Sequence, residues 1–510
     1  GFQETLPFLK DLKDHFGDSL FLEVQPHYIA RQVELNEHII RLSKSLHIPM
    51  IAGCDSHFIL PEQAEERKNL QAGYGGMKDL DAEGALFMDY PDGDELFRRF
   101  QNQGVLSDAQ IEAAIEQTLI FREVEPIAVP RAKKIPNPYR YAPPPLCNLT
   151  AEERAERLRD LVRSAWKARR AGISRDLWPQ YEEAIRYEMD TITETESADY
   201  FLGDYELVQK GKAKGGVLTQ SGRGSGPSYY VNSLLGFSSM DRIALPLKLY
   251  PDRFISKPRL LAGQLPDLDL NVADRKPFLD ALPEVYGEGH FAPMIAYSAQ
   301  KRKAAFKMYA RASGMEPAQA ERIAKQLERY DNAVKYADED EKDAIDLSDY
   351  VDASALKTVE ESEKYTRIVV NKIVHPCAVL IYDGDIRSEI GLVRAKSDSG
   401  KLDEMVTVID GVTADAYGFV KNDLLRVTVW ELIDKLYKAA NLPLPDAMEL
   451  LRWVENDPDT FRIFADGLTL GVNQCEREAT LRRLKRYKPR NFTELAAFVA
   501  HFAPEGDVKL

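Results

Sequence analysis

The sequence has few cysteines and no closely spaced pair of them. Its four cysteines lie far apart in 510 residues, at Cys54, Cys147, Cys377 and Cys475. This spacing excludes a disulfide framework and a zinc knuckle, and it favours a reducing compartment. No apolar stretch reaches the length needed to cross a membrane, and no signal peptide is visible. These absences predict a cytoplasmic protein without a membrane partner.

The sequence also lacks an excess of positive charge. It has 67 Lys and Arg against 82 Asp and Glu, a net charge of −15 and a pI of about 5.2. A globally acidic chain is not typical of nucleic-acid binders, although a local basic patch matters more than the total. The length predicts two to four domains. Because the chain begins with Gly1 and not Met, we expect that its true N-terminus is missing.

Periodic segments predict an α/β domain followed by long helices. "SLFLEVQPH" and "LNEHIIRLSKSLHIPMIAGCDSHFI" have the pattern of a strand, a helix and a second strand. Residues 125–147 are rich in proline and predict a linker. Thr150 and Glu153 form a capping box at the start of a helix, and a second helix over 178–213 is expected to be interrupted near Ser197. The acidic stretch 329–365 favours a solvated helical subdomain or loop.

A glycine-rich stretch, "TQSGRGSGPSYYVNSLLGF", is typical of a phosphate-binding turn. Gly222, Gly224 and Gly226 permit tight backbone angles, and Ser225 is a suitable N-cap for a helix through "YYVNSLL". A helix N-terminus offers N–H groups to an anion, and Arg223 adds a fork of donors. A tight turn before a packed helix explains the same residues equally well.

The stretch "GQLPDLDLN" places two carboxylates two residues apart. In a strand that opens at Pro266, Asp267 and Asp269 would share one face. With a phosphate site nearby they would suit Mg²⁺ bound to a polyphosphate, whereas alone they would fit an exposed strand end. Such sites usually need a third acid, for which Asp423 in "YGFVKNDLLRVTVWELI" is the candidate.

Several motifs in order resemble the alpha subunit of bacterial DNA polymerase III, the family C replicative polymerases. "ADYFLGDYELVQKGKAKGGVLTQSGRGSG" is similar to the family's YFL segment and G-R-G-S loop. "YPDRFISKPR" is similar to E-R-F-L-N-P-E-R, "LPDLDLN" to M-P-D-x-D-x-D-F, and "GFVKNDLLRVTVWELI" to G-L-V-K-F-D-F-L-G-L-x-T-L. "IAYSAQKRKAAFKMYARASG", "LTLGVNQCERE" and "LKRYKPRNFTELAAFVAHFAPEG" match thumb and fingers motifs. The resemblance covers nearly the whole chain.

The resemblance implies a two-metal DNA-directed DNA polymerase acting in replication, with Mg²⁺ as cofactor and Mn²⁺ as a substitute. The family's three catalytic, metal-binding aspartates fall on Asp267, Asp269 and Asp423. Residues expected to bind the dNTP triphosphate are Gly222, Arg223, Gly224, Ser225, Arg253, Arg259 and Lys421, and Lys303 is expected to bind DNA. Implied partners are primer-template DNA, dNTP, the sliding clamp, other replisome subunits and a separately encoded remainder of the polymerase.

The implied fold is a multidomain α/β and α+β chain with a DNA polymerase β-like nucleotidyltransferase palm. The expected division is 1–124, the last part of a polymerase-and-histidinol-phosphatase (PHP) domain; 125–296, first palm segment; 297–373, helical thumb; 374–428, second palm segment; and 429–510, start of the fingers. The implied location is the cytoplasm of a bacterial cell, infected by phage or not.

Departures from the family pattern leave other functions open. Asn271 replaces the last acid of the P-D-x-D-x-D run, "HPCA" replaces H-A-G-G, and Ala503 and Glu505 depart from R-P-G-P. Asp55 and His57 match only the final PHP metal motif, so a structural part is expected for them. The alternatives are a catalytically silent homologue or fragment that binds primer-template DNA or replication proteins, a PHP-type phosphoesterase, and a template-independent nucleotidyltransferase.

Overall fold

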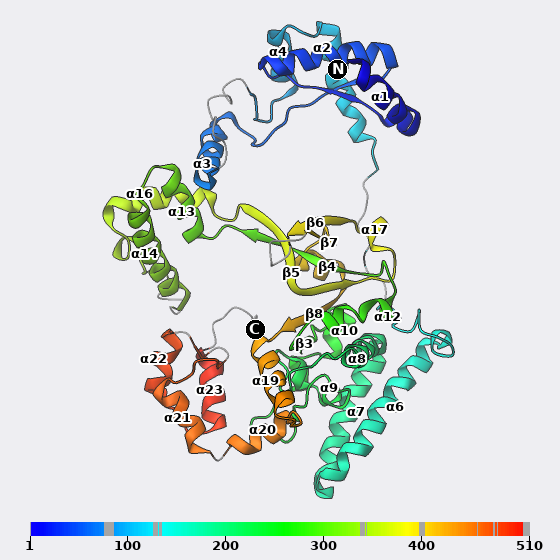
Figure 1. Ribbon diagram of the computed structural model, residues 1–510, viewed down its shortest axis with the longest axis vertical. Coiled ribbons are helices and arrows are strands. Elements are labelled where there is room, and N and C mark those ends of the chain that lie inside the picture. The colour runs from blue at the N-terminus through cyan, green and yellow to red at the C-terminus, as the bar shows by residue number, and fades with distance from the viewer. Residues whose placement is uncertain are drawn as a thin grey trace. The chain divides into compact units, whose positions relative to one another are not determined.

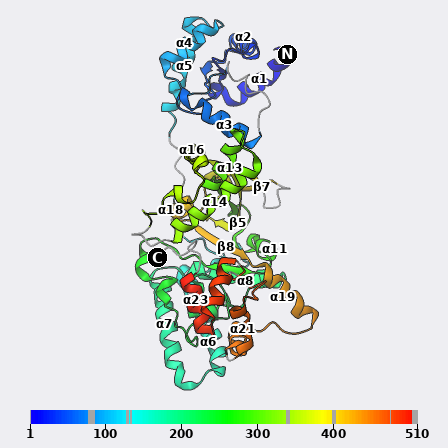
Figure 2. The ribbon, with the colours of Figure 1, turned by 90° about the vertical axis from the view of Figure 1, so that its left-hand side faces the viewer.

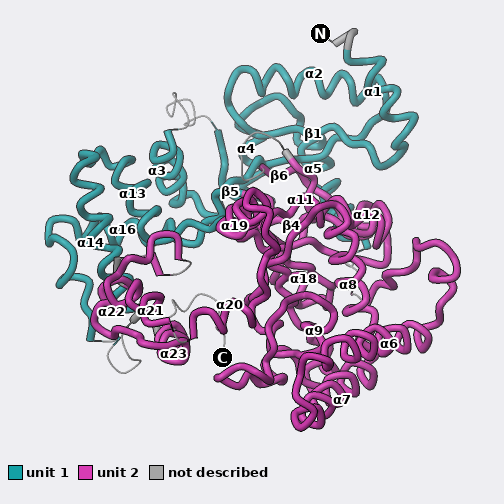
Figure 3. Tube along the Cα trace, turned by 60° about the horizontal axis from the view of Figure 1, so that its bottom comes forward, with its two compact units in different colours: residues 1–128, 298–371 teal, residues 129–297, 372–510 magenta. Residues whose placement is uncertain are grey.

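The chain folds into two compact units, each built from two separate segments (Figure 3). Unit 1 comprises 1–128 and 298–371, and unit 2 comprises 129–297 and 372–510. The computed structural model describes residues 2–75, 86–125, 131, 135–336, 342, 344–396, 403–455, 457–472, 475–476 and 478–502. Ala503 and Glu505, two of the departures from the family pattern, lie outside these residues. None of the described helices is both long enough and apolar enough to span a bilayer.

Unit 1 contains a β-α-β element and a helical cluster. Its strands are β1 (Leu22–Val24) and β2 (Met50–Ala52), and its helices are α1 (Phe2–Phe16), α2 (Ala30–Leu46), α3 (Ala64–Tyr74), α4 (Gly93–Gln103), α5 (Asp108–Gln117), α13 (Arg302–Ala312), α14 (Pro317–Tyr336) and α16 (Leu356–Ser362). β1 and β2 pair in parallel across α2, which confirms the predicted strand-helix-strand element. α13 packs on α3, α14 and α16, so the two segments of the unit share one fold.

Unit 2 contains the main sheet and the larger share of the described helices (Figure 1). Its helices are α6 (Ala151–Arg169), α7 (Trp178–Glu194), α8 (Ala198–Ala213), α9 (Tyr230–Leu234), α10 (Lys257–Leu261), α11 (Lys276–Leu279), α12 (Leu282–Tyr286), α17 (Ile386–Glu389), α18 (Gly411–Tyr417), α19 (Thr428–Ala439), α20 (Ala447–Val454), α21 (Pro458–Asp466), α22 (Glu478–Tyr487) and α23 (Phe492–Phe502). Thr150 and Glu153 form the predicted capping box of α6, and α7 and α8 are interrupted at Thr195–Ser197, as expected.

The main sheet has the strand order β3-β8-β5-β6-β7, with β4 also paired to β5. Its strands are β3 (Asp269–Val272), β4 (Phe291–Ala299), β5 (Val369–Ile381), β6 (Leu392–Lys396), β7 (Asp403–Thr407) and β8 (Val420–Arg426). β8 runs parallel to β3 and antiparallel to β5, so it is central at this end of the sheet. The mixed sheet with covering helices confirms an α/β and α+β architecture.

One face of β8 is buried and the other carries polar side chains. Val420, Asn422 and Leu424 are buried, whereas Lys421 and Asp423 between them are partly exposed. Because successive side chains of a strand point to opposite faces, this alternation separates a core face from a functional face. The core face belongs to the largest hydrophobic cluster, which also contains side chains of α6, α7 and α8.

Candidate active site

Asp269 and Asp423 are direct partners in the parallel pairing of β3 with β8. Partners in a ladder project from the same face of the sheet, so the two carboxyl groups lie side by side on the face opposite the core. Asp269 is the first residue of β3, and Asp423 lies in the middle of β8. The fold therefore brings together two of the three acids expected from the sequence.

Asp267 lies before the strand and not within it. The prediction that the strand opens at Pro266 is wrong, since β3 begins at Asp269. The reason is Tyr200 on α8, whose hydroxyl donates to the carbonyl of Pro266 at 2.8 Å and accepts from the amide of Leu268 at 3.0 Å. The backbone around Asp267 is thus hydrogen-bonded to a side chain instead of to a strand. The Asp267 carboxylate is exposed.

Lys421 links Asp267 to β8. Its Nζ lies 3.5 Å from Asp267 Oδ1 and 2.7 Å from Asp415 Oδ1. Burial lowers the pKa of Lys421, but the hydrogen bond to Asp415 and the nearby Asp267 more than offset burial, and the net pKa is raised. Lys421 therefore stays a cation beside the acids.

Asp423 is partly buried, whereas Asp267 is exposed. Burial raises the pKa of the Asp423 carboxyl, the positive charge of Lys421 opposes that shift, and the negative charge of Asp267 adds to it. Its Oδ1 is buried and has no hydrogen-bond partner among the described residues. A buried carboxylate oxygen without a partner is costly, and a cation would satisfy it.

The glycine-rich loop lies directly against Asp269. The chain before it runs antiparallel to β3, with the Thr219 amide donating to the carbonyl of Asn271 at 2.8 Å. Gly222 and Gly224 both have φ of +68°, a backbone conformation that favours glycine. A Cβ at Gly224 would lie 2.1 Å from Asp269 Oδ2, so a larger residue there would displace the Asp269 carboxylate. The glycines thus allow a close approach between loop and carboxylate.

The loop does not open the expected helix. Ser225 precedes a short 3₁₀ turn, Gly226–Ser228, and makes no capping hydrogen bond through its side chain. Tyr229 is extended, and α9 begins only at Tyr230, where the buried carboxylate of Glu188 accepts from the Val231 amide at 2.7 Å. The prediction of one continuous helix capped by Ser225 is therefore wrong: only a 3₁₀ turn begins there, and a side chain from α7 caps the later start of α9.

Asn271 continues the line of Asp267 and Asp269 but is buried, with 3% of its surface exposed. Its Nδ2 donates to the backbone carbonyl of Asp269 at 3.0 Å. Where the family pattern has an acid, this chain therefore has an amide, and Asn271 forms a hydrogen bond with the backbone of Asp269.

Comparison with known proteins matches residues 156–426, which contain all of these groups, to the bacterial DNA polymerase III alpha NTPase domain. The chain belongs to the bacterial DNA polymerase III alpha family. Residues 431–508 match the finger domain of the DNA polymerase III alpha subunit. The resemblance that the motifs indicated is confirmed.

Curated relatives include the DNA polymerase III subunits alpha of Aquifex aeolicus (strain VF5) and Saccharopolyspora erythraea. The first is 23% identical and its alignment covers 98% of this chain and 44% of the relative, and the second is 24% identical with 99% and 42% covered. The subunit alpha of Mycobacterium tuberculosis (strain ATCC 25618 / H37Rv) is 24% identical, with 96% and 40% covered. The chain thus spans less than half the length of these relatives.

The other residues for which the sequence suggested a role are dispersed over other elements of the fold. Arg253 ends a 3₁₀ turn and Arg259 lies in α10, where its Nε donates to Gln264 Oε1 at 3.4 Å. Both are exposed, and among the described residues neither forms an ion pair with the three acids. Lys303 lies in unit 1, on α13, where it pairs with Glu328 at 2.7 Å. Asp55 and His57 are also in unit 1. The Nε2 of His57 lies 3.5 Å from the Oδ1 of Asp55, and both side chains are about half exposed.

Sequence reasoning missed two potential ligands next to Asp423. Ligand atoms of His375, Cys377 and Asp423 lie within 4.8 Å of one another, the one such trio found in the part of the chain that the structure describes. The amides of Cys377 and Ala378 donate to His375 Nδ1 at 3.3 and 2.8 Å, which holds the imidazole against β5. The replacement of H-A-G-G by "HPCA" was the available signal. Asp423 therefore has Asp269 of β3 on one side and His375 and Cys377 of β5 on the other.

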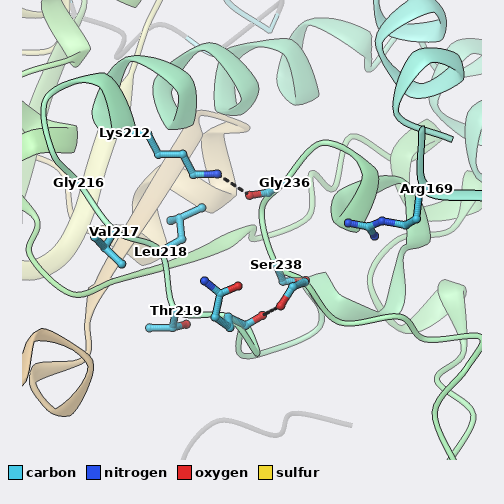
Figure 4. Close-up of a pocket in the computed structure, with 10 residues that line it drawn as sticks. Arg169, Lys212, Gly216, Val217, Leu218, Thr219, Gly236 and Ser238 are labelled. Carbon is cyan, nitrogen blue, oxygen red and sulfur yellow. Dashed lines mark hydrogen bonds between the residues drawn. The ribbon is translucent and has the colours of Figure 1, made fainter. Parts of the chain in front are cut away.

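A pocket of about 330 Å³ lies beside the base of the glycine-rich loop (Figure 4). It is lined by Arg169, Lys212, Gly216, Val217, Leu218, Thr219, Gln220, Gly236, Ser238 and Ser239. Lys212 Nζ donates to the carbonyl of Gly236 at 3.3 Å, and Arg169 donates to Ser233 Oγ at 2.6 Å. None of the three acids lines this pocket, so it adjoins the carboxylate site without being part of it.

Proposed function

We propose that this chain carries the catalytic core of a template-directed DNA polymerase, which transfers dNMP from a dNTP to a primer 3′-hydroxyl in replication. The observation that carries the proposal is the pairing of Asp269 with Asp423 directly against Gly224. Nucleotidyl transfer needs carboxylates for metal beside a loop that can approach phosphates closely, and these features meet here. Membership of the polymerase III alpha family supports the same activity.

The residues present suit a pair of divalent cations. Asp267, Asp269 and Asp423 offer hard oxygen ligands, and a cation would satisfy the Oδ1 of Asp423, which has no hydrogen-bond partner among the described residues. When bound, Mg²⁺, or Mn²⁺ in its place, would lower the pKa of the primer hydroxyl and neutralise charge on the leaving phosphates. Family membership suggests a divalent metal, and Mg²⁺ is our choice because these ligands are all carboxylates.

The chain's own residues would orient the nucleotide. Backbone N–H groups at Gly224 and Ser225 would donate to the triphosphate, since the loop can approach without side-chain obstruction at Gly222 and Gly224. Arg223 and Lys421 would balance its negative charge, Lys421 while remaining paired with Asp415. Arg253 and Arg259 would contribute from the exposed surface after movement of their side chains.

The proposed domain roles rest on the family resemblance. We assign the palm to 125–296 and 374–428, the thumb to 297–373, the PHP-like part to 1–124 and the start of the fingers to 429–510. Lys303 would contact primer-template DNA, and binding through such cations should weaken steeply with salt. The sliding clamp, other replisome subunits and a separately encoded remainder are further proposed partners, in the cytoplasm of a bacterial cell.

Primer extension with and without template, in the presence of Mg²⁺, tests the proposal. Incorporation that depends on template and is lost in Asp267→Ala and Asp423→Ala is the expected result. Incorporation without template would indicate a template-independent transferase instead. DNA binding without incorporation would indicate a silent homologue, and unchanged incorporation in either variant would overturn the site assignment.

A further inference from the structure

Helix α8 lies behind the two strands that carry the proposed metal ligands. Tyr200 and Asp204 are four residues apart on this helix, and side chains at that spacing lie on the same face. Both are buried, with 5% and 3% of their surfaces exposed. Figure 2 shows α8 near β8 from a second direction. One face of a single helix thus reaches β8 and the segment that leads into β3 from the core side.

Tyr200 holds the segment that carries Asp267. Its hydroxyl bridges the peptide groups on the two sides of that acid, donating to the Pro266 carbonyl and accepting from the Leu268 amide. Both backbone groups lack a strand partner, because β3 begins only at Asp269. The phenol thus forms hydrogen bonds with the Pro266 carbonyl and the Leu268 amide, which a neighbouring strand would otherwise satisfy.

Asp204 holds β8 through Asn422. The Asn422 amide donates to Asp204 Oδ1, and this bond is buried. Asn422 stands between Lys421 and Asp423, so its side chain points to the core while theirs point to the functional face. Fixing Asn422 therefore fixes the position along β8 from which Asp423 and Lys421 project.

We propose that Tyr200 and Asp204 are positioning residues that set the separation between Asp267 and Asp423 from behind the sheet. The inference rests on the proposed metal site and adds two residues that never touch metal or nucleotide. Buried hydrogen bonds to the backbone and to Asn422 restrict how far each acid can move. A divalent cation needs its oxygen ligands at nearly fixed distances, so looser acids should bind it more weakly.

Tyr200→Phe is the direct test, because it removes the hydroxyl and keeps the packed ring. Calorimetric titration of the full chain with Mn²⁺ should show affinity about 10-fold weaker than in the wild type, a loss typical of residues that support metal ligands. The Mg²⁺ concentration for half-maximal primer extension should rise by a similar factor, and the rate should recover at saturating Mg²⁺.

Tyr181→Phe is the matched control. Tyr181 is equally buried in the same core, and its hydroxyl donates to Asp241 Oδ2 at 2.8 Å, away from the acids. Losing this bond should lower stability much as Tyr200→Phe does, without changing the Mn²⁺ titration. Equal metal affinities in Tyr200→Phe and the wild type would overturn the role of Tyr200.

Two substitutions at Asp204 test the second contact. Asp204→Asn keeps a carbonyl oxygen for Asn422 and should retain metal affinity, whereas Asp204→Leu removes the acceptor, keeps the branched side-chain skeleton and should weaken it. Equal Mn²⁺ affinity in both variants would overturn the role of Asp204.

The results also separate this inference from the proposed polymerase activity. A wild-type chain that binds Mn²⁺ but does not extend primers would contradict only the activity. A wild-type chain that does not bind Mn²⁺ would contradict both.

Discussion

Asp269 and Asp423 face the same side of the sheet as partners on adjacent parallel strands, although one begins its strand and the other lies in the middle. Asp269 is in contact distance of the glycine-rich loop, and Asp423 has a buried Oδ1 without a hydrogen-bond partner among the described residues. Asp269 therefore responds to changes in the glycine-rich loop, whereas Asp423 can be substituted without altering that loop.

Asp423→Asn should reduce single-turnover dNMP incorporation by at least about 100-fold, since a direct ligand should matter at least as much as the residues that support it. The amide has nearly the same shape, so the fold should be preserved. Circular dichroism and thermal unfolding check this. Asp160→Asn on α6 is the control, because Asp160 is exposed and pairs with Arg163. Full activity in Asp423→Asn would remove this acid from the site.

Gly224→Ala should reduce incorporation by about 100-fold, because the added Cβ displaces the Asp269 carboxylate and misplaced groups lose rate steeply. Gly215→Ala is the matched control: its φ is +88°, yet a Cβ there would meet nothing within 4 Å. Both variants should lose about 1–2 kcal/mol of stability from left-handed backbone. Equal incorporation rates in the two variants would contradict a functional contact between loop and acid.

Arg223→Ala should raise the KM for dNTP by about 10-fold or more, as expected when a charged donor to phosphate is lost. Steady-state primer extension at varied dNTP measures this. Arg163→Ala, an exposed arginine on α6, should leave the KM unchanged. If KM and turnover are both unaffected in Arg223→Ala, the glycine-rich loop is merely a turn.

Asp204 should make stability fall as pH rises. Complete burial raises the pKa of its carboxyl well above the usual value, so the folded state keeps a proton that the unfolded state loses above about pH 4. The resulting stabilisation is complete below that pH and decreases by at most about 1.4 kcal/mol per pH unit until the folded pKa is reached. Urea unfolding between pH 4 and 8 should show a steeper fall in stability with pH for the wild type than for Asp204→Asn, in which other buried acids still titrate. Identical slopes would show that Asp204 ionises normally.

Local sequence patterns predicted the elements that depend on neighbouring residues. The capping box at Thr150, the break between α7 and α8, and the β-α-β element of unit 1 all follow from spacing within a few turns. The two acids and the glycine-rich loop were found as motifs, and Asp423 as a candidate partner. Their direct register could not be predicted, because β8 pairs with β3 only in the folded sheet.

Long-range contacts account for the errors. The start of β3 depends on the Tyr200 hydroxyl, and the start of α9 on the Glu188 carboxylate, each contributed by a different helix. His375 and Cys377 reach Asp423 only through the pairing of β5 with β8. The catalytic roles of Asp267, Asp269 and Asp423 and the role of Lys303 in DNA binding remain predictions.

The chain connectivity of the paired acids has a consequence for biosynthesis. Between Asp269 and Asp423 the chain leaves unit 2, contributes residues 298–371 to unit 1, and returns. Closing so long a loop is slow compared with forming local helices, and a growing chain cannot attempt it before β8 has left the ribosome. Nascent chains that end before Asp423 therefore lack the paired site, however completely α6, α7 and α8 have folded.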